Sequence, residues 1–166
     1  MNVWITTIST SKFAGINTLW AAMMREDFIP DKVHLIHLHS GKVDKESQKI
    51  ARTGYLNLLK RYGSKNKLVL HDFDETEFSS ISTKMASLVR EEKSEGNTVA
   101  IDMTPGRKFM SAFSMYMGVG PGLKHKADKF YYLHVKELGQ HSGRPYPMIP
   151  SNLMTLYDLK KEVTGK

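Results

Sequence analysis

The chain of 166 residues contains no cysteine, so disulfide bonds and thiolate metal sites are excluded. It also has no apolar run near the roughly 20 residues that cross a bilayer. Its first eight residues carry no basic segment with a small-residue cleavage site, and so do not resemble a signal peptide. We therefore expect no membrane segment in this chain and a cytoplasmic location, with which the lack of cysteine is consistent.

Two common nucleotide-binding motifs are absent as well. Neither G-x-G-x-x-G nor G-x-x-x-x-G-K-[ST] follows the first predicted strand, and the glycine-rich residues 118–122 follow a predicted helix, where they indicate a helix end. An NAD enzyme is therefore not expected, and no cofactor is predicted. What the chain has is positive charge: 24 Lys and Arg against 17 Asp and Glu give a net charge of +7, which favours an anionic partner.

Short β-branched segments alternate with amphipathic helical patterns along most of the chain. The predicted strands are 3–8, 33–38, 68–70, 98–101 and 130–135, and the predicted helices are about 16–23, 45–62, 78–95 and 107–117. This order predicts an α/β fold, namely a Rossmann-like open, mainly parallel sheet with helices on both faces. We expect one domain over residues 1–150, with 151–166 as a C-terminal short helix or tail.

The loop after the first predicted strand, T-I-S-T-S-K at residues 7–12, is the first candidate site. It offers four hydroxyl groups, an ammonium group and backbone N–H groups at the start of a helix, a combination that suits a phosphate or another anion. The alternative is a helix cap with solvated hydroxyl groups.

The second candidate site is D-M-T-P-G-R-K-F-M-S at residues 102–111, between the fourth predicted strand and its helix. Gly106 permits close approach of the backbone, and Arg107 and Lys108 place two cations in the first turn. The helix dipole disfavours cations there, so the pair favours an anion held between them. The alternative is two surface side chains.

This second segment resembles the second signature of the CARF family, the CRISPR-associated Rossmann-fold domains, and the 7–12 loop resembles the first. The resemblance covers roughly residues 2–135. Pro105 departs from it, because the family usually has a second glycine there. Residues 1–150 would then be a CARF-like domain that forms a homodimer and binds cyclic oligoadenylate, foremost cyclic tetra-adenylate, across its two-fold axis. The pocket residues implied by the resemblance are Ser9, Thr10, Ser11, Lys12, Thr104, Gly106, Arg107 and Lys108.

Three functions remain open. The resemblance is closest to single-domain ring nucleases, in which the 2′-OH of each adenosine attacks the adjoining phosphorus without a metal; Ser11, Arg107 and Lys108 would be the catalytic residues. The first alternative is a non-catalytic sensor domain of an effector. The second is a basic Rossmann-like protein that binds RNA or another nucleotide. No DNA partner is expected.

Three other groups of side chains have less specific interpretations. His34 and His37 alternate across a strand, so no shared metal site is predicted. Tyr131, Tyr132 and His134 are expected in the core, or stacked on an adenine near the strand end. Residues 136–147 are expected to form either a lid over a ligand or a plain surface loop.

Overall fold

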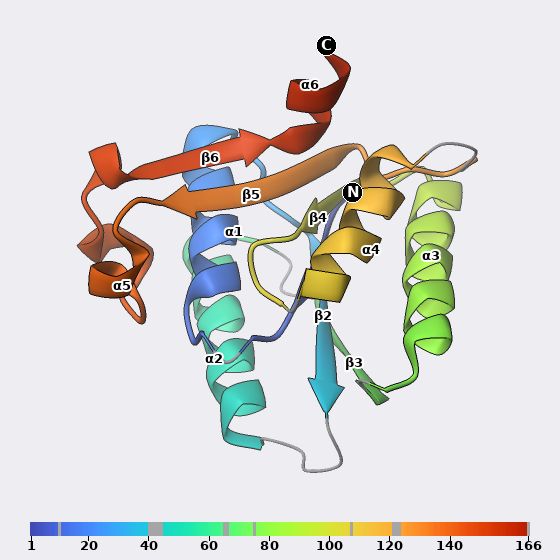
Figure 1. Cartoon of the computed structure of the whole chain (residues 1–166), viewed down its shortest axis with the longest axis horizontal. Helices are drawn as coiled ribbons and strands as arrows, with labels where there is room; N and C mark the ends of the chain where they lie inside the picture. Colours follow the sequence, from blue (N-terminus) through green and yellow to red (C-terminus); the bar gives the residue numbers. More distant parts are fainter. Residues whose placement is uncertain are drawn as a thin grey trace.

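The computed structural model describes residues 1–9, 11–39, 45–64, 67–74, 76–106, 108–120 and 124–165. Six strands form one sheet in the order β3-β2-β1-β4-β5-β6 (Figure 1). The first five strands are parallel, and β6 pairs with β5 in the antiparallel direction. The predicted Rossmann-like, mainly parallel architecture is confirmed.

Strands and helices alternate through β5. The strands are β1 Asn2–Thr7, β2 Lys32–His39, β3 Lys67–Asp74, β4 Thr98–Asp102, β5 Lys129–Val135 and β6 Met154–Asp158. The helices are α1 Ala14–Arg25, α2 Lys45–Arg61, α3 Phe78–Ser94, α4 Lys108–Val119, α5 Leu138–His141 and α6 Leu159–Thr164, with 3-10 turns at Tyr146–Met148 and Ser151–Leu153. Within the described ranges, no helix is both long and apolar enough to cross a membrane.

The sheet is buried on both faces, and successive residues of β1 show this directly. Val3 and Ile5 pack with residues of α3 and α4, whereas Trp4 packs with residues of α1 and α2. Because side chains alternate along a strand, one short apolar run contributes side chains to the hydrophobic cores on both faces of the sheet. Trp4 lies 5.5 Å from Tyr131, ring centroid to centroid, and the two rings are stacked. Tyr131 is thus a core residue.

The C-terminal segment differs from the prediction. Residues 151–165 contain more than the expected short helix or tail: a 3-10 turn leads into β6, which pairs with the outer edge of β5, and the short helix α6 follows. The carboxylate of Asp158 accepts a hydrogen bond from the backbone N–H of Phe130 at 3.1 Å, which ties the end of β6 to β5. A five-residue strand after a proline-rich segment has too little periodicity to be seen in the sequence.

Strand β3 is longer than predicted. The sequence predicted a strand over residues 68–70, whereas β3 spans Lys67–Asp74. Phe73 is buried and packs in the core, while Asp72 is exposed beside His37 of β2.

Candidate functional site

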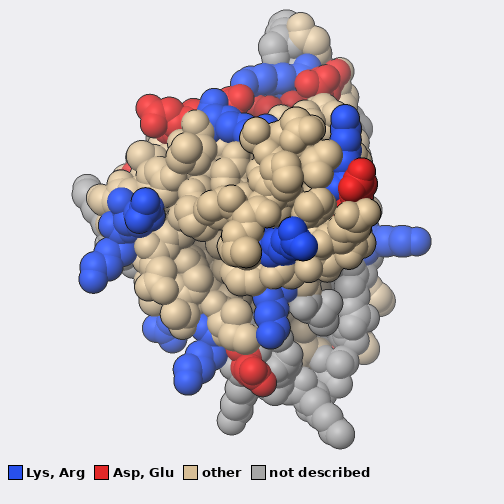
Figure 2. Space-filling view, turned by 90° about the vertical axis from the view of Figure 1, so that its left-hand side faces the viewer, with Lys and Arg blue, Asp and Glu red and all other residues tan. Residues whose placement is uncertain are grey.

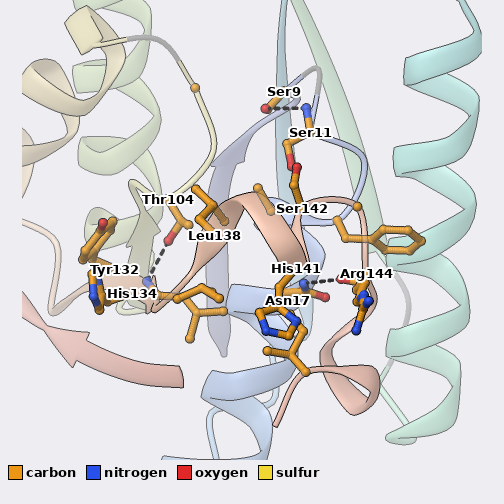
Figure 3. A pocket seen from close by; sticks show the side chains of 17 residues that line it. Ser9, Ser11, Asn17, Thr104, Tyr132, His134, Leu138, His141, Ser142 and Arg144 are labelled. Atoms are coloured by element: carbon orange, nitrogen blue, oxygen red, sulfur yellow. Dashed lines mark hydrogen bonds between the residues drawn. The ribbon is translucent and has the colours of Figure 1, made fainter. Parts of the chain in front are cut away.

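A pocket of about 440 Å³ lies where β1, β4 and β5 end. Its walls come from Ser9, Ser11, Phe13, Ala14 and Asn17, from Thr104 and Gly106, from residues 132–135 of β5, and from Leu138, residues 141–144 and Ile149 (Figure 3). The strand order reverses between β1 and β4, and open α/β sheets bind ligands at the carboxyl ends of strands at such a switch point. The position of the pocket therefore follows from the topology.

The loops after β1 and β4 are held together below the pocket. The hydroxyl of Thr7 donates to the backbone oxygen of Pro105 at 2.8 Å. Gly106 has φ +117°, and a Cβ added there would lie 2.7 Å from the Thr7 Oγ1. Side chains rarely adopt such a φ, so this position needs glycine for its conformation and for its closeness to β1. The two segments chosen from the sequence thus meet.

Two hydroxyl groups of the pocket are held in place by backbone N–H groups. The Oγ1 of Thr104 accepts from the N–H of Leu133 at 2.8 Å, and the Oγ of Ser9 accepts from the N–H of Ser11 at 3.0 Å (Figure 3). A hydroxyl group that accepts such a bond keeps its own proton for donation. The Ser9 hydroxyl therefore keeps a proton for an oxygen-rich anion, whereas the Thr104 side chain also bonds to the carboxyl group of Asp102.

A buried carboxyl group stands at the end of β4. Asp102 is 1% exposed, and it accepts hydrogen bonds from the Thr104 N–H at 2.9 Å and from the Thr6 hydroxyl at 3.1 Å. Burial raises the pKa of Asp102 to about 7, although both bonds oppose the rise. This side chain positions the turn that carries Thr104 and Gly106.

The segment after β5 forms the outer wall. The Nδ2 of Asn17, on α1, donates to the backbone oxygen of Arg144 at 2.9 Å and ties this segment to α1. In Figure 3, Ser9 and Ser11 enter the pocket from one side, and Asn17, His141 and Arg144 from the other. Of the two interpretations of residues 136–147, the structure favours a segment that covers the pocket, since Leu138 and residues 141–144 line it.

The residues chosen from the sequence fall into three groups. Ser9, Ser11, Thr104 and Gly106 line the one pocket. Lys12 and Lys108 are exposed and stand outside its lining, Lys108 as the first residue of α4. Thr10 and Arg107 lie outside the described residues.

The sequence missed Asn17 as a pocket residue. A lone asparagine on an amphipathic helix gives no signal, because its neighbour across the pocket comes from a segment 127 residues later. Tyr132 and His134 do line the pocket, at the strand end where stacking on a base was considered. His134 is exposed, whereas Tyr132 is half-buried.

The remaining histidines belong to a different region. His34 bonds to Glu92 and to His71, both at 2.8 Å, and Lys32 bonds to Glu92 at 2.7 Å. Burial lowers the pKa of His34, against the opposing effect of Glu92. His37 bonds instead to Asp72. In the part of the chain that the structure describes, no three His, Asp or Glu side chains gather as a metal site would need.

Charge on the surface is unevenly distributed. Figure 2 shows the left-hand side of Figure 1, where α5 lies, and there Lys and Arg surround a broad uncharged area while Asp and Glu lie at its margins. Such an arrangement attracts anions toward this side of the molecule.

The fold and the pocket define a Rossmann-like α/β domain with a pocket at the carboxyl edge of its sheet. Residues 18–164 match the family model described as CRISPR-associated protein NE0113, and the protein belongs to that CRISPR-associated family. No curated protein matches the chain.

Solved structures share the fold. One is Enterococcus italicus Csm6 bound to cyclic hexa-2'-fluoro-hexa-dAMP, with 14% sequence identity and a TM-score of 0.52 over 70% of this chain. The matched part is 30% of that structure's length, so this chain corresponds to a fraction of it. At this identity the likeness shows the common fold.

Proposed function

We propose that the protein binds cyclic oligoadenylate in the pocket at the ends of β1, β4 and β5, as a CARF-type domain. The observation that carries the proposal is the joining of two hydroxyl-bearing loops in one pocket, where backbone N–H groups hold the hydroxyl oxygens of Ser9 and Thr104 in place. The CRISPR-associated family supports it, as does the fold shared with a Csm6 structure bound to a cyclic oligonucleotide.

The size of the pocket supports a homodimer. Pockets for drug-sized ligands measure roughly 300–1,000 Å³, and this one, at about 440 Å³, suits a part of a four-nucleotide ring. A ring of four adenylates is itself two-fold symmetric. Two copies of the pocket facing each other across a two-fold axis would share it, each holding half. We therefore propose cyclic tetra-adenylate as the ligand and a homodimer as its receptor.

We propose that the basic side chains identified in the sequence lie at the rim of the pocket. Lys12 and Lys108 belong to the two joined loops and are exposed, so their ammonium groups would approach the phosphates at the pocket's edge. Exposed charges steer an anionic ligand and add modest affinity. Arg107 and Thr10 keep their proposed binding roles, and Arg107 also keeps the proposed catalytic one.

Ring cleavage is the second candidate function, and the position of Ser11 in the pocket favours it. In this reaction a ribose 2′-OH attacks the adjoining phosphorus, the bond to the 5′ oxygen breaks, and the products are a 2′,3′-cyclic phosphate and a 5′-OH. The proton lost by the 2′-OH is matched by one gained at the 5′ oxygen. Ser11, Arg107 and Lys108 would stabilise the phosphorane, and His134 offers an imidazole as proton acceptor.

One incubation distinguishes the functions. Purified protein is mixed with cyclic tetra-adenylate, cyclic hexa-adenylate or linear tetra-adenylate; binding is measured by calorimetry, and products are separated after hours with and without EDTA. We expect the cyclic tetramer to bind most tightly, because a closed ring loses less conformational freedom. Cleavage that persists in EDTA supports the nuclease, and an intact bound ring supports the sensor. Equal affinity for linear and cyclic forms would favour a general RNA-binding protein instead.

Light scattering tests the homodimer. The two-fold assembly predicts a dimer at micromolar concentration when the ring is present. A monomer both with and without the ring would contradict it.

A further inference from the structure

The outer wall of the pocket contains a short segment whose hydrogen bonds are internal to it. Residues 138–143 comprise α5 and the turn that follows. Among the described residues, their hydrogen bonds all join members of the segment 137–144. Five of the six residues are exposed, and only His141 is buried, at 8% exposed. Moving this segment as a unit would therefore break no hydrogen bond to the rest of the described chain.

The chain on either side of this segment is fixed. Before it, the N–H of Lys136 donates to the backbone oxygen of Leu153 at 2.8 Å, at the end of the β5–β6 pair. After it, the backbone oxygen of Arg144 accepts from the Nδ2 of Asn17 on α1 at 2.9 Å (Figure 3). Residues 138–143 thus lie between two anchored points.

The backbone is left-handed at both ends of the segment. Glu137 has φ 53°, and Gly143 has φ 79°. This conformation is unfavourable for Glu137, which has a Cβ, and ordinary for a glycine. Rotation at these two positions would move the residues between them and would release the strain at Glu137.

The imidazole of His141 adds a second unfavourable feature to the closed position. Its Nδ1 is buried and has no hydrogen-bond partner. A buried polar atom without a partner costs free energy that hydration would recover. Burial of the ring favours closure, whereas the unpaired nitrogen and the strained Glu137 favour opening. Segments with such opposing contributions open locally without global unfolding.

We propose that residues 138–143 form a lid that swings about Glu137 and Gly143, opens to admit a ring to the pocket and closes to retain it. Leu138 and residues 141–143 of the lid line the pocket, so its movement changes access to that pocket. A lid that closes over a bound ring also keeps water from it. The ligand of the lid rests on the proposed function, whereas opening is a property of the chain without ligand.

The absence of cysteine allows opening to be measured directly. His141→Cys places a thiol where only an open lid exposes it, and its reaction with dithionitrobenzoate reports opening. Two variants bracket the rate: Gln140→Cys is exposed in the closed lid, and Ala22→Cys lies in the core at 0% exposed. We expect the thiol at position 141 to react at least about tenfold more slowly than that of Gln140→Cys and at least about a hundredfold faster than that of Ala22→Cys.

Substitutions at the two hinges should change this rate in opposite directions. Adding Gly143→Ala puts a Cβ on a left-handed residue of the closed lid and should speed the reaction by about tenfold. Adding Glu137→Gly should slow it by about threefold, because strain is removed from the closed lid while glycine gains freedom in the open one. Gly96→Ala is the matched control: Gly96 has φ 75° and, like Gly143, open space around it, but it lies between α3 and β4.

A second measurement leaves His141 unchanged. Nitroxide labels on Gln140→Cys and Asn57→Cys, which are both exposed, report the distance from the lid to α2. Pulsed electron resonance should show two distance populations, and Gly143→Ala should enlarge the open one. This measurement keeps the proposal testable if His141→Cys does not fold in thermal unfolding.

Cyclic tetra-adenylate connects the lid to the pocket. At a concentration that saturates binding in calorimetry, the ring should slow the reaction of the thiol at position 141 by at least about tenfold, because a ligand stabilises the state that holds it. A rate equal to that of Ala22→Cys, or hinge variants that behave like Gly96→Ala, would overturn the lid. A ring that binds without slowing the reaction overturns its role in retention. Opening as expected with no ring binding establishes the lid and overturns the proposed function.

Discussion

Replacing Asp102 with asparagine should change how the stability of the protein depends on pH. The pKa of this carboxyl group is raised from its ordinary 3.8 to about 7, because burial penalises the charged form. The folded protein therefore keeps the proton over a pH range in which the unfolded chain has released it. In that range the free energy of unfolding falls as pH rises, and the penalty is complete above about pH 7.

The size of the effect follows from the two pKa values. At 1.36 kcal/mol per pKa unit, ionising the buried group costs roughly 4 kcal/mol in total. Part of this cost is present at pH 5, so the change between pH 5 and pH 8 is about 3 kcal/mol. Asparagine has a similar shape and does not titrate, and its amide can still bond to the Thr104 N–H and the Thr6 hydroxyl.

The assay is chemical unfolding of both proteins at half-unit steps from pH 5 to pH 8. The difference between them isolates Asp102, because all other groups titrate in both. We expect Asp102→Asn to gain about 3 kcal/mol relative to the wild type over this range, with a plateau above pH 7. Asp27→Asn is the control, since Asp27 is exposed and its φ of 52° suits asparagine. A flat difference between pH 5 and pH 8 would refute the assignment of a buried, protonated Asp102.

Three further predictions concern other parts of the molecule. Gly106→Ala should lower the free energy of unfolding by about 1–3 kcal/mol, because of its positive φ, and should weaken ring binding in the same samples. Lys32→Met should destabilise the protein by about 3 kcal/mol in denaturant titrations, because it removes the ammonium partner of the buried Glu92 carboxylate and leaves only the bonds from His34 and Asn97; ring affinity should be unchanged, because the pair lies far from the strands' carboxyl ends. Lys108→Ala should abolish any ring cleavage but weaken binding by no more than about fivefold, since Lys108 is exposed. Ser11→Ala should slow cleavage by about 10²–10³ with little loss of affinity. If Lys108→Ala still cleaves the ring, the charge-stabilising role belongs to Arg107 or Lys12.

The first five strands and the four long helices could be predicted because each is specified by local periodicity. The joining of the two candidate loops also followed from the sequence, since parallel strands bring their carboxyl ends to one edge. Strand β6 could not be predicted, because its five residues owe their conformation to pairing with β5 rather than to local preference. The same holds for β3 beyond Leu70, where the predicted strand ended but pairing with β2 keeps the chain extended to Asp74.

The pocket shows why the candidate site was only half visible in the sequence. Ser9, Ser11, Thr104 and Gly106 follow strands directly, so topology alone brings them together. The opposite wall depends on one tertiary hydrogen bond, from the Asn17 side chain to the backbone oxygen of Arg144. Every residue has a backbone oxygen, so the amino-acid sequence does not indicate this bond. The strand ends therefore provide the hydroxyl groups that suit phosphate, whereas the wall that would contact a base is built by the segment after β5. The CARF-like signature of the two loops predicts contacts with phosphate groups, but it does not predict how the base would be recognised.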